Sequence, residues 1–393
     1  MLKKPIAIFI VPTNYSSLKE KGVLNILKDR EEYGKFKKII VIHPFTKKTQ
    51  KILYSKIQEI HEFKYSFSNN FLRFLLLPVH IIKILFFVNK LCKNMKIDFI
   101  RAQDPYVSGM LGLMIAKLLK CKFCISIHAD YDKRHLLDPR FGAPKICGSR
   151  FLAKQIERLN LGSSDLLLPI RESLKQKLIK NGYLKRKIEV LPHIVNLNHY
   201  KLKPNKLFFK KNKISPKSKI ISFSGRFSKE NYIYDYIKIA KNFIDNNKIK
   251  FVMAGDGVEM ASIKKIIEND KKLKKRILLL GFVDSQEVRN LRQLSYINLS
   301  LMGGFSLIEC CASGRPTISY EVEWHSELIE NERTGYLVKE NDHQEVCRII
   351  KKLITMPKKA LILGEKAKKI TFQKHNYSQN KNKRIQIYQK LLK

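Results

Sequence analysis

The sequence feature that limits the fold most is the regular alternation of short apolar runs with longer amphipathic stretches. In the first half, the runs rich in β-branched residues read PIAIFIVP, KIIVIH, IDFIR, KFCISIH, DLLLP and KIEVLP. After residue 200 the pattern starts again with KIISFSG, IKFVMAG, RILLLG, YINLS, PTISY and GYLV. Such alternation is typical of parallel sheets with helices on both faces. The sequence therefore predicts an α/β protein with two doubly wound domains.

A polar stretch between the two sets of apolar runs marks the domain boundary. It reads NLNHYKLKPNKLFFKKNKISPKS, is rich in lysine and has no clear periodicity. We place the first domain at residues 1–197 and the second at 198–370, which leaves 371–393 as a C-terminal segment. The chain has 393 residues, of which 44% are hydrophobic, and this is enough for two cores.

The charge of the chain is strongly positive. There are 77 Lys and Arg against 34 Asp and Glu, a net charge of +43. Such a charge favours nucleic acid, anionic lipid or phosphorylated ligands. The lysines are spread along the whole chain, so a general compositional bias explains the charge equally well. A nucleic-acid-binding protein would need clustered basic residues with aromatic platforms or a known motif. The sequence shows neither, and we expect no nucleic-acid partner.

Residues 71–92 form the most hydrophobic part of the chain. The segment FLRFLLLPVHIIKILFFVNKLC is interrupted by charged residues and lacks the long uncharged run of a membrane-spanning helix. Two interpretations stay open: an amphipathic helix on a membrane surface, or a buried helix of the first domain. The seven cysteines are odd in number and no secretory signal precedes them, so we expect reduced thiols and a cytoplasmic protein. The inner face of the membrane is a candidate partner.

The stretch GGFSLIECCASGRP at 303–316 contains an acid whose position is unusual. The glycine pair predicts a turn, Ser306 is expected to cap a helix, and Gly314 with Pro316 would end it. Glu309 would then lie on a buried helix, where a carboxylate must be paired or hydrogen-bonded. Glycines also follow successive strands of the second half, at the end where α/β sheets bind ligands. They are Gly225, Gly255, Gly257 and Gly281.

The motifs of the second half resemble those of the retaining nucleotide-sugar glycosyltransferases of family 4. SGRFSKENY, MAGDGVE, LLGFV, GGFSLIECCASGRPTIS and HSELIENERTGYLV occur in the order seen in that family. The resemblance implies the GT-B architecture: two facing Rossmann-like domains, with residues 371–393 forming a helix that returns to the first. It also implies a hexosyltransferase that moves a sugar from a nucleoside-diphosphate sugar to a hydroxyl of a glycan or lipid-linked acceptor, in bacterial surface polysaccharide or glycolipid synthesis.

The resemblance assigns roles to individual residues. It implies that Arg226 binds the diphosphate, that Glu309 accepts hydrogen bonds from the ribose, and that His128 lies near the donor sugar and acceptor. The donor-binding residues that we name with it are Gly225, Gly255, Gly257, Phe282, Val283, Gly304, Phe305, Ser306 and Leu307. Lys229 is either a replacement for a phosphate-binding lysine of the family or an exposed loop lysine. For the acceptor side we name Asn14, Tyr15, Asp104 and Asp130.

The sequence departs from the family pattern in three places. Asn231 stands where the family usually has a second phosphate-binding Lys, and Leu301 stands where it usually has the first Glu of a Glu-x7-Glu pair. EVEWHSEL replaces a glycine pair before Glu327. No D-x-D motif follows a strand of the second half, so no metal or other cofactor is expected. Two alternatives stay open: a sugar-nucleotide epimerase of the same architecture, which the 303–316 motif does not support, and a basic nucleic-acid-binding protein.

Overall fold

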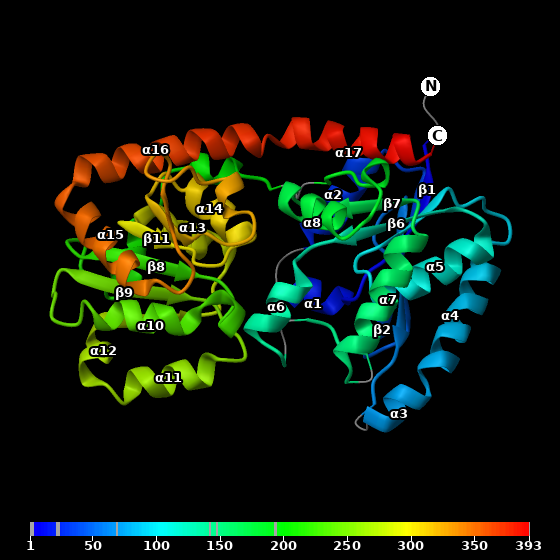
Figure 1. The fold of residues 1–393 in the computed structure, drawn as a ribbon, viewed down its shortest axis with the longest axis horizontal. Coiled ribbons are helices and arrows are strands. Elements are labelled where there is room, and N and C mark those ends of the chain that lie inside the picture. The colour runs from blue at the N-terminus through cyan, green and yellow to red at the C-terminus, as the bar shows by residue number, and fades with distance from the viewer. Residues whose placement is uncertain are drawn as a thin grey trace. The chain divides into compact units, whose positions relative to one another are not determined.

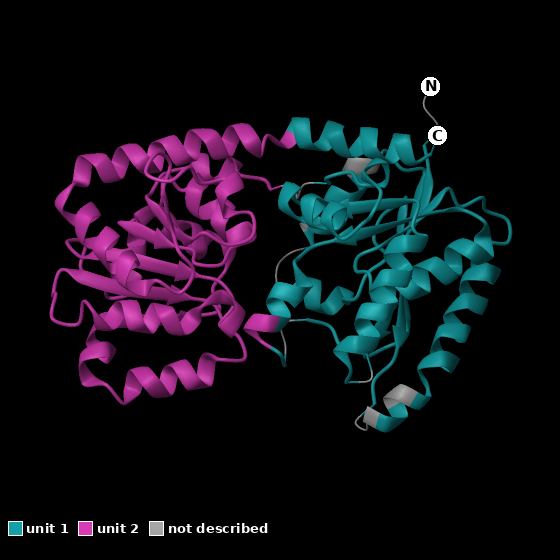
Figure 2. Ribbon diagram, viewed as in Figure 1, with its two compact units in different colours: residues 1–135, 139–193, 378–393 teal, residues 136–138, 194–377 magenta. Residues whose placement is uncertain are grey.

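The chain folds into two α/β units (Figures 1 and 2). The computed structural model describes residues 4–20, 24–67, 70–140, 143–146, 148–191 and 195–392. The first unit consists of residues 1–135, 139–193 and 378–393, and the second of residues 136–138 and 194–377. The predicted boundaries are at 197/198 and 370/371. The short excursion at 136–138 had no signal in the sequence.

The first unit is built on a seven-stranded sheet with the order β3-β4-β2-β1-β5-β6-β7. All neighbouring pairs are parallel except β3 and β4. The strands are β1 Ile6–Ile10, β2 Lys38–Thr46, β3 Gln50–Leu53, β4 Gln58–Lys64, β5 Phe99–Ala102, β6 Lys122–Ile127 and β7 Leu166–Pro169. The expected strand KIEVLP is not one of them. Its Ile188 forms only an isolated bridge to Leu167, and its last residue lies outside the described part of the chain.

Helices cover both faces of this sheet. One face packs on helices α4, α5, α7 and α8 through Ile84, Ile115, Leu161 and Leu174, among others. The other face packs on α2 and on the C-terminal helix α17, as the contacts of Phe9 and Leu27 with Tyr388 and Ile387 in one core cluster show. The predicted return of the C-terminal helix to the first domain is thereby confirmed. The helices are α1 Tyr15–Glu20, α2 Asn25–Gly34, α3 Asn70–Leu75, α4 Leu77–Cys92, α5 Val107–Leu119, α6 Tyr131–Leu137, α7 Arg150–Ser163, α8 Glu172–Lys180 and α17 Tyr377–Leu391.

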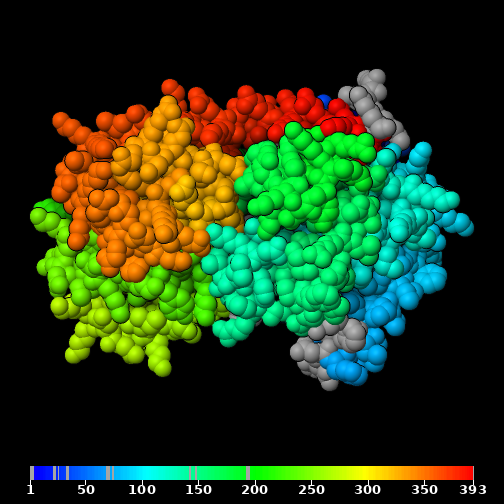
Figure 3. All heavy atoms as spheres, viewed as in Figure 1, coloured from blue at the N-terminus to red at the C-terminus, as the bar shows by residue number. Residues whose placement is uncertain are grey.

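Helix α4 is buried on one side, as the interpretation as a helix of the first domain expects, and exposed on the other; the membrane-surface interpretation stays a prediction. His80, Ile81, Ile84, Val88 and Cys92 are buried against the sheet. On the opposite side Val79, Ile82 and Phe86 are 61%, 49% and 73% exposed. In the space-filling view, the light-blue atoms of this segment lie at the surface (Figure 3). Among the described residues, no helix has the length and apolar character needed to cross a bilayer.

The second unit contains a six-stranded parallel sheet with the order β10-β9-β8-β11-β12-β13. Its strands are β8 Lys219–Ser224, β9 Ile249–Ala254, β10 Ile277–Gly281, β11 Ile297–Leu299, β12 Thr317–Tyr320 and β13 Tyr336–Val338. Its helices are α9 Leu207–Lys211, α10 Ile233–Lys241, α11 Met260–Glu268, α12 Lys271–Arg276, α13 Ser285–Leu294, α14 Phe305–Ala312, α15 His343–Thr355 and α16 Pro357–Lys374. The short 3-10 turns η2 (Asn198–Lys201), η3 (Lys229–Asn231) and η4 (His325–Glu327) also belong to it. Both units are doubly wound, as predicted.

Candidate active site

The loops that follow β8 and β9 pack backbone against backbone at the carboxyl edge of the second sheet. A Cβ at Gly255 would lie 1.8 Å from the carbonyl oxygen of Gly225, and Gly255 has a φ of +136°. A Cβ at Gly257 would lie 2.4 Å from the carbonyl oxygen of Phe227. Because no side chain fits there, Gly255 and Gly257 are needed for the shape of the loops themselves. The amide of Gly255 donates to the carbonyl of Gly281 at 2.8 Å, which ties the loop after β10 to the same edge.

The loop after β8 presents two cations. The Arg226 side chain is 68% exposed, and its Nη1 lies 3.3 Å from Oε1 of Glu230. Lys229 is exposed and forms no ion pair among the described residues. Asn231, which replaces the expected Lys, holds the loop closed: its Nδ2 donates to the carbonyl of Arg226 at 2.9 Å and to Oγ of Ser228 at 3.2 Å. Asn231 therefore lacks the positive charge of the expected Lys and instead stabilises the loop through hydrogen bonds.

Helix α14 begins without a side-chain cap. The expected cap by Ser306 is wrong, because the N-cap position is Gly304 and Ser306 already lies inside the helix. The preceding loop is fixed by two residues of the segment that follows β12. Gly303 donates to Nε2 of His325 at 3.1 Å, and its carbonyl accepts from Nε1 of Trp324 at 2.9 Å. The departure EVEWHSEL thus supplies the two rings that hold the α14 loop. An uncapped helix N-terminus attracts anions.

Glu309 has a protein partner that the sequence did not reveal. Its Oε2 accepts a hydrogen bond from Nη1 of Arg292 on α13. Arg292 is buried, and it also donates from Nε to Ser224 Oγ at 2.8 Å and from Nη1 to the Tyr200 hydroxyl at 2.9 Å. Burial would lower the pKa of Arg292, but Tyr200 and Glu309 together raise it well above its usual value. Arg292 is therefore permanently charged.

The expectation that a ligand alone would satisfy Glu309 needs correction, because Arg292 satisfies half of the carboxylate. The Glu309 side chain is still 26% exposed. Its Oε1 accepts no hydrogen bond from any residue that the structure describes. One oxygen is thus held in place by Arg292, and the other is free to accept a hydroxyl from outside.

The remaining predicted donor-side residues differ in what they can offer. Phe282 and Phe305 are 67% and 46% exposed, so their rings are available to a ligand. Val283 packs into a core cluster with Ala254, and Leu307 is fully buried. Only the backbone groups of Val283 and Leu307 could face a ligand. No group of three or more His, Cys, Asp or Glu side chains that could hold a metal occurs among the described residues.

In the first unit, His128 directly follows β6. Its Nε2 lies 2.9 Å from Oε1 of Gln103, which follows the neighbouring strand β5. Burial lowers the pKa of His128 to about 3, and the charges of Arg101, Arg384 and Arg171 act in the same direction. His128 is therefore a neutral imidazole at physiological pH, able to donate or accept a hydrogen bond but not to act as a cation.

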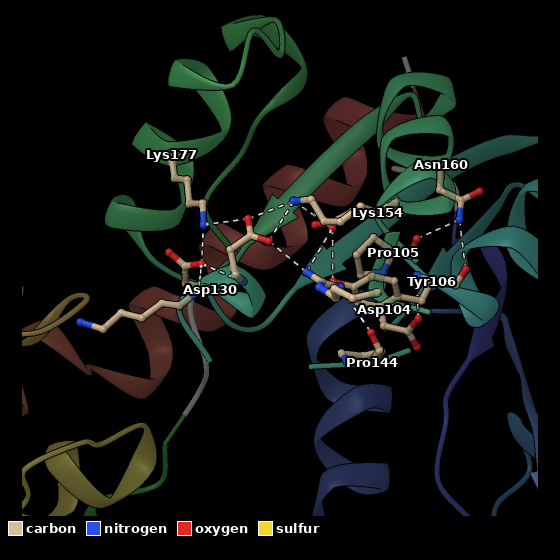
Figure 4. Close-up of polar contacts among 12 residues, drawn as sticks. Asp104, Pro105, Tyr106, Asp130, Pro144, Lys154, Asn160 and Lys177 are labelled. Atoms are coloured by element: carbon tan, nitrogen blue, oxygen red, sulfur yellow. Dashed lines mark hydrogen bonds and ion pairs between the residues drawn. The ribbon is translucent and has the colours of Figure 1, made fainter. Parts of the chain in front are cut away.

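Three of the predicted acceptor-side residues are used by the fold itself. Asn14 accepts the amide of Ser17 at 2.7 Å and so caps α1. The backbone amide of Tyr15 donates to Oε1 of Glu62 at 2.6 Å. Asp104 accepts the amide of Tyr106 at 2.8 Å before α5, and burial raises the pKa of Asp104 (Figure 4).

Asp130 lines a pocket of about 430 Å³ between α6, α7 and α8. It pairs with Lys177, and its Oδ1 accepts the amide of Lys133 at 3.0 Å at the start of α6 (Figure 4). Beside it, Asp132 lies 2.9 Å from Lys154 Nζ. Burial would raise the pKa of Asp132, but Lys154 and Lys177 outweigh it and lower the pKa to about 2. The charges of this pocket are matched by one another, so they join three helices.

Known proteins resemble this chain in sequence and in fold. The family model described as glycosyl transferases group 1 matches residues 204–370. The UDP-Gal:α-D-GlcNAc-diphosphoundecaprenol α-1,3-galactosyltransferase of Escherichia coli is 28% identical over 264 residues, which cover 64% of this chain and 65% of that enzyme. Sucrose-phosphate synthase of Thermosynechococcus elongatus has a similar structure, with a TM-score of 0.77, 14% identity and 99% of both chains covered. Anabaena HepE in complex with UDP gives 0.72 and 15%, again over 99% of both chains.

Proposed function

We propose that this chain is a retaining hexosyltransferase, because residues 204–370 match the family model of the group 1 glycosyl transferases and the chain has the GT-B fold. It would move a sugar from a nucleoside-diphosphate sugar to a hydroxyl of a glycan or lipid-linked acceptor. One observation carries the proposal: Arg226 and the uncapped start of α14 follow the neighbouring strands β8 and β11 at the carboxyl edge of the second sheet. Arg292 joins these two places through hydrogen bonds to Ser224 and to Glu309, whose other oxygen accepts no hydrogen bond from a described residue.

Each of these groups suits one part of the donor. Breaking the bond to the sugar leaves charge on the diphosphate, and exposed Arg226 and Lys229 with the α14 amides would stabilise it. Oε1 of Glu309 would accept a ribose hydroxyl while Arg292 fixes the carboxylate through Oε2. Exposed Phe282, at the end of β10, would contact the base. In the retaining reaction, the leaving phosphate oxygen takes the proton of the acceptor hydroxyl on the same face.

The acceptor would be held by the first unit. Neutral His128, fixed by Gln103, would hydrogen-bond to the transferred sugar or to the acceptor hydroxyl. The E. coli relative acts, by its name, on a sugar carried by a lipid diphosphate. We extend that acceptor class to this chain, and with it a role in bacterial surface polysaccharide or glycolipid synthesis. Nothing in the comparisons favours the epimerase or the nucleic-acid-binding alternative.

We also propose that the reaction needs no metal ion, since exposed Arg226 and Lys229 supply positive charge at the expected diphosphate. Activity should survive EDTA. Complete loss of activity that Mg²⁺ or Mn²⁺ restores would contradict this part of the proposal.

The first unit would rest on the inner face of the membrane through α4. The exposed residues Val79, Ile82 and Phe86 form one apolar strip, and exposed Lys83 and Lys90 lie on the same helix. Apolar insertion combined with about 1 kcal/mol from each basic residue near an anionic surface is enough for attachment. Flotation with anionic vesicles at low salt tests this. The variant Val79→Ser/Phe86→Ser should float less than wild type, whereas Leu361→Ser, an exposed apolar change on α16, should not. Equal flotation of all three would contradict α4 attachment.

The enzymatic proposal is tested by incubating the full chain with UDP-, GDP- and ADP-sugars and measuring the release of the free nucleoside diphosphate. We expect release from one nucleotide class, with or without added acceptor, and its loss in Arg226→Ala. Release that is unchanged in Arg226→Ala, or absent for every nucleotide sugar, would count against the proposed function.

A further inference from the structure

Two arginines of the first unit, one buried and one half-buried, contact the same aromatic ring and have no carboxylate partner among the described residues. Arg101 lies on β5 and is 5% exposed, and Arg30 lies on α2. Their guanidinium carbons lie 5.7 Å and 5.1 Å from the centroid of the same ring, that of Phe9 on β1. No Asp or Glu among the described residues forms an ion pair with either arginine. This pair differs from Arg292 of the second unit, which is buried with Glu309 as its partner.

The hydrogen bonds of the two guanidinium groups are incomplete. Arg101 donates from Nε to Ser126 Oγ at 2.8 Å and from Nη1 to the hydroxyl of Tyr388 on α17. Its Nη2 makes no hydrogen bond in the described chain and, unlike Nη1 of Arg30, is not sealed from solvent. Arg30 makes no hydrogen bond at all among the described residues. Several guanidinium N–H donors of Arg30 and Arg101 therefore have no acceptor among the described residues.

The arrangement of the two arginines carries a free-energy cost. A buried charge is costly unless it is paired, and a second like charge beside it adds repulsion. Burial, and after it the charge of Arg101, lowers the pKa of Arg30 to about 10, which still leaves Arg30 protonated at neutral pH. The ring of Phe9 offsets part of the cost through cation–π contact. What would offset the rest is an anion.

The pair also lies where an open α/β sheet binds ligands. The chain winds outward from β1 to β2 on one side and from β5 to β6 on the other, so the winding reverses between β1 and β5. Ligands bind at such a switch point, outside the carboxyl ends of the strands. Arg101 is the last residue but one of β5, and Gln103, which holds His128, follows that strand. The two cations therefore lie next to the expected acceptor side.

We infer that Arg30 and Arg101 bind a phosphate group of the acceptor, with Tyr388 of the C-terminal helix positioning Arg101. Guanidinium groups bind phosphate oxygens through paired, charge-assisted hydrogen bonds, and two of them match a doubly charged group. This inference rests on the proposed transferase function, which it sharpens by giving the acceptor a phosphate. The phosphate could belong to a soluble compound or to a lipid headgroup.

The test is a calorimetric titration of inorganic pyrophosphate into the full chain carrying Arg226→Ala, which weakens the proposed donor site. On this background, Arg30→Gln and Arg101→Gln should each weaken pyrophosphate binding at least tenfold, and Arg30→Lys should weaken it less than Arg30→Gln. Arg186→Gln removes an exposed charge of the same unit and should change nothing. Unchanged affinity in Arg30→Gln would overturn the inference. If Arg101→Gln fails to fold, Arg30→Gln, on the half-buried partner, decides alone.

Two further measurements separate the possible sources and the possible failures. If the phosphate belongs to a lipid, flotation with vesicles containing phosphatidic acid should also fall in Arg30→Gln. If it belongs to a soluble compound, only pyrophosphate binding should fall. Nucleoside diphosphate affinity, measured in otherwise wild-type chains, should be the same with and without Arg30→Gln. If Arg30→Gln loses phosphate binding but keeps nucleotide binding, the proposed function is unaffected. If no nucleotide binds to the wild-type chain, the proposed function is contradicted, whatever the result for phosphate.

Discussion

The two sheet edges of this chain handle charge in opposite ways. In the second unit, the buried cation Arg292 has its carboxylate Glu309, and the exposed cations Arg226, which pairs with Glu230, and Lys229 face solvent. In the first unit, the acids Asp130 and Asp132 pair with lysines, while buried Arg101 and half-buried Arg30 have no carboxylate partner among the described residues. In the second unit, the buried charge is paired and the exposed cations face outward, which suits a ligand that binds and leaves. In the first unit, the cations have no carboxylate, so this edge needs an anionic ligand to balance them.

The largest expected effect concerns the balanced cation of the second unit. Glu309→Ala would leave Arg292 buried and uncompensated, and breaking a buried pair in this way costs about 3–5 kcal/mol of unfolding free energy. We expect the lower end, because Glu309 is 26% exposed. Arg226→Ala breaks a pair whose cation is 68% exposed and should cost less than about 1 kcal/mol. Urea denaturation of both variants checks this, and equal losses would show that Arg292 does not depend on Glu309.

The second effect concerns pH and the first unit. His128 has a folded pKa of about 3, below the ordinary value near 6.5, so below pH 6.5 the unfolded chain binds a proton that the folded chain does not. Stability should therefore fall as the pH drops from about 6.5 towards 3, by at most about 1.4 kcal/mol per pH unit from this residue. His128→Gln should flatten the profile of denaturation midpoint against pH in that range. A profile with the same slope would mean that His128 titrates normally.

A smaller effect is expected from the paired charges around the α6–α8 pocket. Lys177→Met removes one partner of Asp130 and of Asp132, but these side chains are partly exposed, so the loss should be about 1 kcal/mol. Because the pKa of Asp132 is held near 2, its contribution is present at neutral pH and is lost only as the pH falls from about 4 through 2. Thermal unfolding at pH 7 compared with Lys175→Met, a neighbouring lysine on α8, measures it. A loss above about 3 kcal/mol would mark the pocket as essential to the fold.

Much of this could be predicted from the sequence, because the signals were local. Alternating apolar runs predicted both sheets, and the motif order predicted the GT-B fold and the family. The β3–β4 pair was missed because β4 buries polar residues such as Gln58, Glu59 and Glu62, which break the apolar pattern. The capping serine was misplaced by the adjacent glycines, either of which can begin a helix.

The remaining features depend on contacts through space. Arg292 lies 17 residues before Glu309, on another helix, and nothing in the local sequence links them. Asp104 and Asp130 were plausible cleft residues by position, but whether a carboxylate caps a helix or faces a ligand is decided by neighbouring amides. The Arg30 and Arg101 pair could not be foreseen, because the absence of a partner can be established only by counting every side chain around it.

Nucleoside diphosphate binding tests the central claim, that the second unit is the donor side of a transferase, most directly. UDP, GDP and ADP are titrated calorimetrically into wild type, Arg226→Ala and Arg30→Gln. The account predicts that one nucleotide binds wild type, that Arg226→Ala weakens it about ten- to a hundredfold through loss of a charged hydrogen bond worth about 1.5–3 kcal/mol, and that Arg30→Gln leaves it unchanged. Equal affinity in wild type and Arg226→Ala, or no binding of any of the three, would contradict it.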